Sequence, residues 1–134
     1  MKNIMFTNPL VPVSWGEFTD KLTILEIKQE KLDNQDSLKN VNKELSFLRD
    51  IIHKYNYLSI IEEEKNLLKS VNLKLWNILN DINDKTLKIE FDQEFIDLSV
   101  SVAVCNRHRH KLKKMIDQKL NSEISEEKKY KPYK

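Results

Sequence analysis

The chain has 134 residues, of which 40% are hydrophobic and 33% are charged, a composition typical of one globular domain with a single core. It holds one glycine and three prolines, which excludes the turn-rich sandwiches and barrels and favours a mainly helical fold. The formal net charge is only +2, but residues 106–134 hold ten Lys or Arg against four Asp or Glu, a net charge of +6. This asymmetry permits an anionic partner or the acidic face of a second copy.

Cys105 is the only cysteine, so an internal disulfide is impossible and a reducing compartment is expected. The N-terminal residues include no apolar run long enough for a secretory signal or a membrane span. We therefore expect a cytoplasmic protein that makes no membrane contact.

Residues 1–13 are predicted to form an extended arm, because Pro9 and Pro12 interrupt any helix there. We expect the apolar side chains of the arm to lie across the helices, since leaving them in water would forgo burial energy. These side chains are Ile4, Met5, Phe6, Leu10 and Val11.

The first predicted helix covers residues 15–32 and begins with a capping box, Ser14 followed three residues later by Glu17. Its main apolar face is formed by Phe18, Leu22, Leu25 and Leu32. Ile24 and Ile27 fall on the opposite side. A helix that is apolar on two sides is expected at the centre of a bundle or at the seam of a homodimer.

Two further helices are predicted at residues 37–54, with Asp36 as the N-cap, and at residues 59–84, with Ser59 and Glu62 as a second capping box. Apolar residues spaced three and four apart in residues 38–52 indicate the seam of a helical hairpin. We expect it to fold back antiparallel to the first helix.

The last predicted helix covers residues 93–120 and is capped by Asp92. Residues 99–104 alternate between polar and apolar, which would also suit a strand, but a longer helical face runs through them and favours the helix. Residues 121–134 are predicted to be a loosely ordered tail. The expected fold is thus one all-α domain, residues 1–134, with about four helices in two antiparallel hairpins.

Several motifs occur together along the chain: Pro-Val-Ser-x-Gly-Glu at 12–17, Asp-Lys-Leu-Thr-Ile-Leu-Glu-Ile-Lys at 20–28, Leu-Trp at 75–76, Phe-Asp at 91–92, Phe-Ile at 95–96, Asn106 with Arg109, and Glu-Glu-Lys-x-Tyr at 126–130. Over nearly its whole length the chain resembles a family of short bacterial and phage proteins, classed as a domain of unknown function. Similar segments occur near genes for cell-surface sugar assembly, so the resemblance implies a context and no activity. The chain departs from the pattern at Arg107, where an acid is commoner, and at His110, where a small residue is.

The strongest candidate for a site is Arg109, which falls in the middle of the apolar face of the last helix. An arginine there must pair with a carboxylate or a bound anion, because an unpaired buried charge is very costly. One interpretation is a structural ion pair, and the other is an anion-binding pocket. The candidate site residues are Glu17, Asp20, Lys21, Thr23, Glu26, Asn106 and Arg109.

Other chemistry is less favoured. Cys105 and His108 can share a helical face, but His110 points elsewhere and no zinc-binding motif is present, so no metal and no cofactor are predicted. The acidic residues near both ends of the third helix are interpreted as solvated helix ends, not as a magnesium site. The basic segment from Arg107 to Lys119 lacks an aromatic platform, so nucleic acid is the least favoured partner.

From these observations we expect a non-enzymatic helical adaptor that forms a homodimer and binds a protein partner. The alternative function is binding or turnover of an anionic small molecule, such as a phosphosugar, at the Arg109 cluster. Nucleic-acid binding through the last helix is the third possibility.

Overall fold

The computed structural model describes residues 6–130, and this part of the chain contains helices and no strand. The elements are α1 (Trp15–Lys31), α2 (Gln35–Tyr55), a short 3-10 helix η1 (Leu58–Ile61), α3 (Glu62–Leu87) and α4 (Gln93–Lys119). The all-α prediction is confirmed, and residues 99–104 belong to α4 rather than to a strand. Within residues 6–130, no helix is long and apolar enough to cross a membrane.

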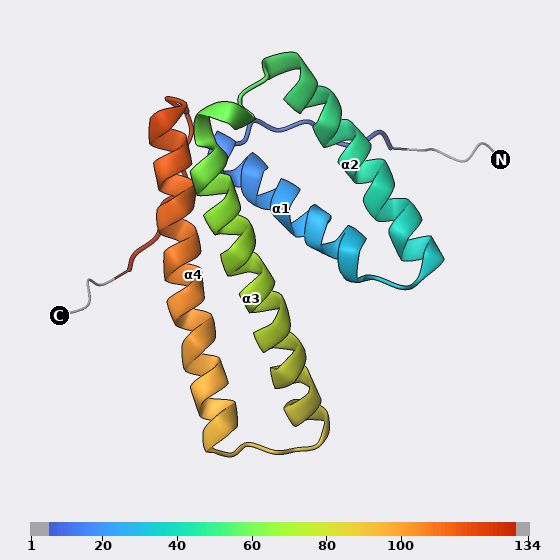
Figure 1. The fold of residues 1–134 in the computed structure, drawn as a ribbon, viewed down its shortest axis with the longest axis vertical. Coiled ribbons are helices and arrows are strands. Elements are labelled where there is room, and N and C mark those ends of the chain that lie inside the picture. Colours follow the sequence, from blue (N-terminus) through green and yellow to red (C-terminus); the bar gives the residue numbers. More distant parts are fainter. Residues whose placement is uncertain (1–5, 131–134) are drawn as a thin grey trace.

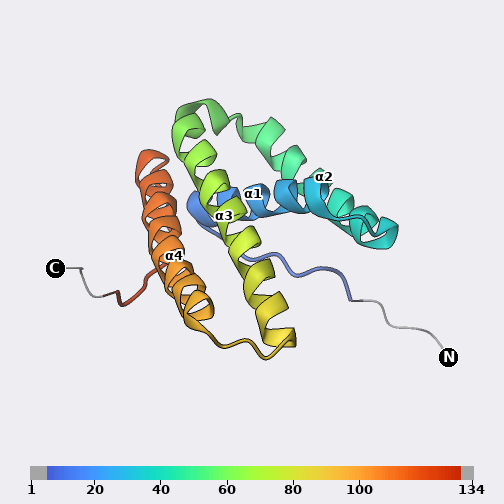
Figure 2. The same cartoon turned by 60° about the horizontal axis from the view of Figure 1, so that its bottom comes forward.

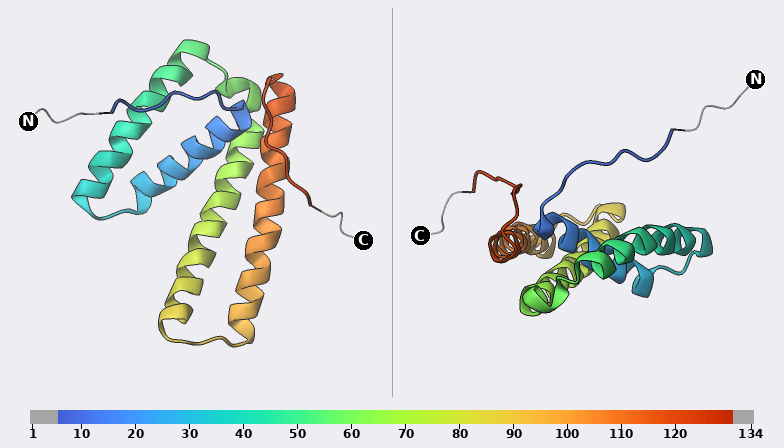
Figure 3. Two further views of the ribbon diagram at one scale, coloured as in Figure 1. Left: turned by 180° about the vertical axis from the view of Figure 1, so that it is seen from behind. Right: turned by 90° about the horizontal axis from the view of Figure 1, so that it is seen from above.

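The helices form two hairpins, α1 with α2 and α3 with α4 (Figure 1). Seen from a second direction, α1 crosses the upper part of the α3–α4 hairpin, and α2 folds back over the far side of α1 (Figure 2). Helix α1 contacts the other three helices, so its predicted central position is confirmed. The lower half of the α3–α4 hairpin extends beyond α1 and α2, as the view from behind also shows (Figure 3).

The N-terminus of α1 docks on the C-terminal turns of α4. Ser14 Oγ accepts a hydrogen bond from the Glu17 backbone N–H at 3.0 Å, as the capping box predicts. The Ser14 cap does not satisfy the Gly16 N–H, which instead donates a hydrogen bond to Asp117 Oδ1 at 2.7 Å. A Cβ on Gly16 would lie 2.3 Å from the Lys113 carbonyl oxygen, so the close approach of the two helices requires glycine.

The core consists of two clusters. The larger one joins all four helices and includes Phe18, Leu22, Leu25, Val41, Leu45, Leu48, Tyr57, Ile61, Leu68, Leu112 and Ile116. Tyr57 bonds to the Thr19 hydroxyl at 3.0 Å, and burial raises the pKa of Tyr57 to about 12. The smaller cluster, Leu75, Ile78 and Cys105, lies within the α3–α4 hairpin alone.

Two predicted N-caps are wrong. Asn34, not Asp36, caps α2, and its side chain accepts from the Ser37 N–H at 3.0 Å. Ser59 lies inside η1, whose tighter turn runs directly into α3, so Glu62 is the first residue of the α-helix and no side chain caps it. Helix α3 also continues past the predicted end, to Leu87.

The extended arm does not pack across the bundle as expected. Phe6, Leu10 and Val11 are 92%, 96% and 71% exposed, and Ile4 and Met5 lie outside the described residues. The reason is that the four helices fill the core with their own side chains, and the arm runs over the outside, where Asn8 shares a shallow groove with α2.

Residues 121–130, expected to be loosely ordered, make specific contacts with α1 and α4. Ser122 Oγ accepts a hydrogen bond from the Trp15 N–H at 3.1 Å. The Tyr130 ring packs edge-on against His110, with the ring centroids 5.5 Å apart. The Arg107 guanidinium lies 4.9 Å from the centroid of the same tyrosine ring, a cation–π distance. This segment therefore follows the surface of α4.

Candidate functional site

An ion pair between Asp20 of α1 and Arg109 of α4 lies at the centre of the candidate site. Arg109 Nε donates to Asp20 Oδ1 at 2.7 Å, and Nη2 donates to Oδ2 at 2.5 Å. The Asp20 side chain is 2% exposed and that of Arg109 is 30% exposed. The hydrogen bonds from Arg109 to Asp20 raise the pKa of Arg109, and burial opposes this shift. The geometry is the bidentate one that gives guanidinium–carboxylate pairs their strength.

Two further polar side chains complete this group, which we call the buried polar cluster: Asp20, Thr23, Asn72 and Arg109. Asn72 of α3 donates from Nδ2 to Asp20 Oδ1 and to Thr23 Oγ1, both at 2.9 Å. Thr23 in turn donates to the Asp20 carbonyl oxygen at 2.8 Å. The carboxylate thus accepts from two helices while it is held on a third, and the cluster fixes the relative positions of α1, α3 and α4.

A second charged group lies one turn further along α4. Lys113 Nζ, with a side chain only 7% exposed, donates to Glu17 Oε2 at 2.7 Å and to Glu126 of the tail. The hydrogen bond from Lys113 lowers the pKa of Glu126 from its ordinary value of 4.5 to about 2. The pKa of Lys113 is raised: burial opposes the charge, but the bonds to Glu126 and Glu17 outweigh it.

Four predicted site residues take no part in the buried polar cluster: Glu17, Lys21, Glu26 and Asn106. Glu17 bonds to Lys113 instead, and Asn106 lines a neighbouring cavity. Lys21 pairs with Glu44 of α2 at 2.9 Å, on an exposed surface. Glu26 pairs with Lys65 of α3 at 3.3 Å and lies 3.9 Å from Lys69, so it is not the partner of Arg109.

A groove on the α2 side of Asp20 has walls of mixed charge. Three cationic and three acidic side chains line it, together with Ile24 and Leu25: Lys21, Lys28, Arg109, Glu17, Asp20 and Glu44. Because these charges balance, the groove offers a polyanion such as a phosphosugar little net attraction.

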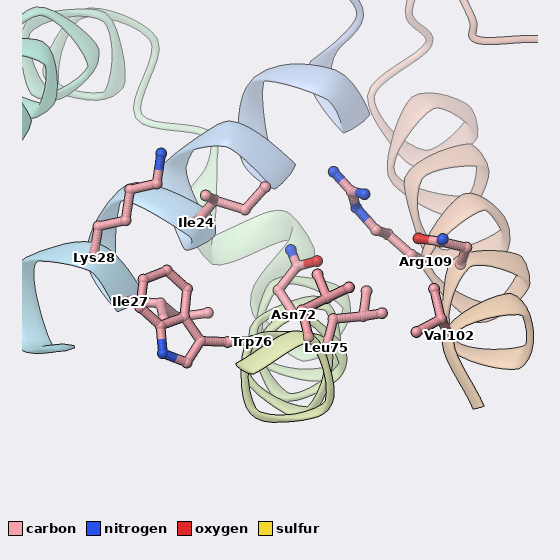
Figure 4. Close-up of a pocket in the computed structure, with 10 residues that line it drawn as sticks. Ile24, Ile27, Lys28, Asn72, Leu75, Trp76, Val102 and Arg109 are labelled. Carbon is pink, nitrogen blue, oxygen red and sulfur yellow. The ribbon is translucent and has the colours of Figure 1, made fainter. Parts of the chain in front are cut away.

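On the other side of Arg109 lies a cavity of about 350 Å³, between the C-terminal half of α1 and the middle of α3 and α4 (Figure 4). We call it the apolar cavity. Its lining residues are Ile24, Ile27, Lys28, Asn72, Leu75, Trp76, Leu79, Val102, Asn106 and Arg109. Ile24 and Ile27, the second apolar side of the first helix, thus face this cavity. Figure 4 shows the lining side chains converging from the three helices around one space.

The basic segment of α4 is largely neutralised. Besides Lys113, Lys114 Nζ bonds to Glu127 at 2.8 Å, and Lys119 Nζ bonds to Glu64 Oε2 at 3.1 Å. The bond from Lys119 lowers the pKa of Glu64. In residues 6–130, no group of three His, Cys, Asp or Glu side chains is arranged to hold a metal ion. These pairings leave little concentrated positive charge for a phosphate backbone.

Sequence reasoning brought Arg109, Asp20 and Thr23 to one site and placed Asn106 near it, but it missed Asn72, Trp76 and Lys113. Asn72 had a readable signal, because it stands between Leu68 and Leu75 on the apolar face of its helix. A polar residue on such a face needs a buried partner.

No protein-family model, no curated protein and no solved structure matches this chain. The family resemblance seen in the sequence therefore stays a prediction.

Proposed function

We propose that this chain is a small non-enzymatic interaction module that acts as a homodimer, with the outer face of α4 as the surface where two copies meet. The observation that carries this proposal is a row of three apolar side chains, Ile96, Val100 and Val104, which we call the outer stripe. They follow one another at intervals of four residues and are 50%, 58% and 50% exposed. Apolar rows of this kind on an exposed helix face are typical of protein interfaces.

The outer stripe lies on the side of α4 opposite the residues that pack on α3. Cys105 is buried in the small core cluster, and Leu98 and Val102 pack against it. Residues 98–106 contain no charged side chain, in a chain where 33% of residues are charged. A solvated helix face would be expected to carry such charges, so the absence favours a covered face.

The charges at the two ends of the stripe favour a second copy as the occupant. Asp97 precedes Val100 and Lys111 follows Val104, all on the same side of α4. If two α4 helices pack antiparallel about a twofold axis, Val100 of each faces Val104 of the other, and each Asp97 approaches the basic turn of its partner. This isologous arrangement pairs apolar with apolar and acidic with basic surface.

The buried polar cluster supports a structural rather than a catalytic use of Arg109. Asp20 accepts three hydrogen bonds from Arg109 and Asn72, and it holds three helices together. A nucleophile or general base must have a lone pair that can reach a substrate, and this carboxylate is 2% exposed.

The test is the mass of the protein in solution, measured by light scattering after gel filtration and by sedimentation equilibrium. We expect a dimer for the wild-type chain and a monomer of unchanged helicity for Val100→Glu. Asn40→Glu, the matched change on the exposed face of α2, should remain dimeric. Asp97→Lys should weaken the dimer, and the exchange Asp97→Lys with Arg107→Asp, the residue that this register places opposite Asp97, should restore it. A wild-type monomer at high concentration, or a Val100→Glu dimer, would overturn the proposal.

A further inference from the structure

We propose that the apolar cavity is a binding site for a small amphiphilic monoanion, a molecule with an aliphatic or aromatic body and a single carboxylate head. The inference does not depend on the homodimer, because the outer stripe is on the opposite side of α4. It rests on the size of the cavity, on its apolar walls, and on the hydrogen-bond donors at one end.

The size and the walls suit the body of such a molecule. The volume of about 350 Å³ falls at the lower end of the range of roughly 300–1,000 Å³ found for ligand pockets. Ile27 and Leu75 are buried behind the surface, while the indole of Trp76 and the side chain of Leu79 border the space. Leu79 is 51% exposed, so an apolar ligand in the cavity would also remove this side chain from water.

The Arg109 end of the cavity has hydrogen-bond donors that other described residues do not use. Arg109 uses Nε and Nη2 for Asp20, and among residues 6–130 its Nη1 has no acceptor. Lys28, which is half-buried and lies across the cavity from Arg109 (Figure 4), has no carboxylate partner within the described range and adds a positive charge to the lining. The Asn106 amide, in the wall beside Arg109, makes no hydrogen bond to another described residue. Arg109 Nη1 and the Asn106 amide N–H can together bind one carboxylate.

The charge of the lining residues determines which sign of charge the ligand can carry. Lys28 and Arg109 are the charged side chains among the ten that line the cavity in the described structure, and none of the ten is a carboxylate. A cationic head would therefore be repelled. Asp20, behind Arg109, cancels one of the two positive charges, so the remaining field suits a monoanion better than a phosphate with two charges.

The choice of an amphiphile over a sugar follows from the distribution of polar groups. Apart from Lys28, the polar groups lie at the Arg109 end, and the remaining walls are hydrocarbon or indole. Several sugar hydroxyls in contact with such walls would lose their hydrogen bonds to water without replacement. An alkyl chain or an aromatic ring makes no such demand.

The experiment is a calorimetric titration of the full chain with decanoate, below its micelle concentration, with decyltrimethylammonium and glucose 1-phosphate titrated in parallel. We expect decanoate to bind once per chain and at least about tenfold more tightly than either of the other two. Equal binding of decanoate and the cation would overturn the proposal, and so would tighter binding of glucose 1-phosphate or a wild-type chain that takes up no decanoate.

Two variants locate the site. Asn106→Asp keeps the shape of the side chain but adds a negative charge beside the head group, and should weaken decanoate binding by about tenfold. The matched control Asn77→Asp, on an exposed face of α3, should change it by less than about twofold. Leu79→Trp, which fills the cavity from its exposed side, should abolish binding with the helical circular dichroism unchanged. If decanoate binding survives Leu79→Trp, or responds equally to the two Asn→Asp changes, the site is not this cavity.

The titration also separates this inference from the homodimer. Val100→Glu should bind decanoate as the wild-type chain does, since its side chain lies on the other side of α4. Loss of decanoate binding in Val100→Glu, with helicity intact, would show that a dimer interface and not the apolar cavity holds the ligand.

Discussion

Arg109 and Asp20 are 89 positions apart in the sequence, yet two hydrogen bonds of 2.7 and 2.5 Å join their side chains. The pair connects the middle of α4 to the second turn of α1. Because Asp20 is 2% exposed, its charge has little access to water and depends on the guanidinium and on Asn72.

Replacing Arg109 should therefore destabilise the protein strongly. We expect Arg109→Gln to lower the free energy of unfolding by about 3–5 kcal/mol, the range for a buried carboxylate that loses its partner. Chemical denaturation followed by circular dichroism measures this change. Lys21→Ala, which removes the exposed pair with Glu44, should cost less than about 1 kcal/mol.

The double variant Asp20→Asn with Arg109→Gln tests whether the loss of stability in Arg109→Gln comes from the unpaired Asp20 carboxylate or from other contacts of Arg109. If the cost of Arg109→Gln comes mainly from the stranded carboxylate, the double variant should be more stable than Arg109→Gln alone. Strictly additive losses would contradict this explanation.

Gly16 should not tolerate even one added methyl group. The Cβ of Gly16→Ala would lie 2.3 Å from a backbone carbonyl oxygen of α4 and 2.9 Å from Asp117 Oδ1. Since a backbone cannot rotate away, we expect a loss of at least about 2 kcal/mol and a lower melting temperature. Asn40→Ala, in an exposed helical position, should stay within about 0.5 kcal/mol of the wild type. A Gly16→Ala protein as stable as that control would rule out the close helix contact.

Acid should release the tail segment 121–130 from α4. Glu126 has a pKa of about 2 while it is bonded to Lys113, against an ordinary value of 4.5. Its contribution is therefore fully present above about pH 4.5 and is lost as the pH falls towards 2. NMR signals of Tyr130, followed against pH, should move towards free-chain positions over this interval.

Glu126→Gln provides the control for the acid effect. This variant should show a partly released tail already at pH 7 and little further change as the pH falls from about 4.5 towards 2, because the titrating group is gone. Lys113 keeps its bond to Glu17 in the variant, so the fold itself should remain. A tail transition in Glu126→Gln identical to the wild type would assign the titration to another group.

The thiol of Cys105 should react slowly in the native protein. Its side chain is 6% exposed in the small core cluster, so a disulfide reagent can reach it only when the α3–α4 hairpin opens. We expect the reaction to become fast in concentrated guanidinium. In the control, His108→Cys places a second thiol at an exposed position three residues further along the same helix, and this thiol should react quickly in the folded protein. If the two thiols react at equal rates in the native protein, the packing of α4 against α3 is contradicted.

The long helices and the Asp20–Arg109 pair could be predicted because both follow from local patterns and one strong energetic rule. Helical periodicity fixed α4 to within one residue, and a charge in the middle of an apolar face required a carboxylate. The caps at the start of α2 and α3 could not be chosen in this way. Asn34, Asp36 and Ser59 are all good capping residues. Which residue caps the helix depends on where the preceding chain enters it.

The apolar cavity and the contacts of the tail were not predictable, since they depend on helix-crossing geometry. The sequence shows that Ile24 and Ile27 form a second apolar side of α1, but a second copy, another helix or a cavity would suit that side equally. The tail is rich in lysine and glutamate, which usually indicates a solvated segment, and only the position of Lys113 gives Glu126 a partner.

The docking of α1 on the end of α4 has a consequence for the order in which the chain can fold. The groups that satisfy the Trp15 and Gly16 N–H donors come from Ser122 and Asp117, 107 and 101 residues later. During synthesis, the N-terminal turn of the first helix has only its local Ser14 cap until Asp117 and Ser122 have been added to the chain. A chain that ends before the last turn of α4 therefore lacks two hydrogen bonds at the start of its first helix as well as the end of its last one.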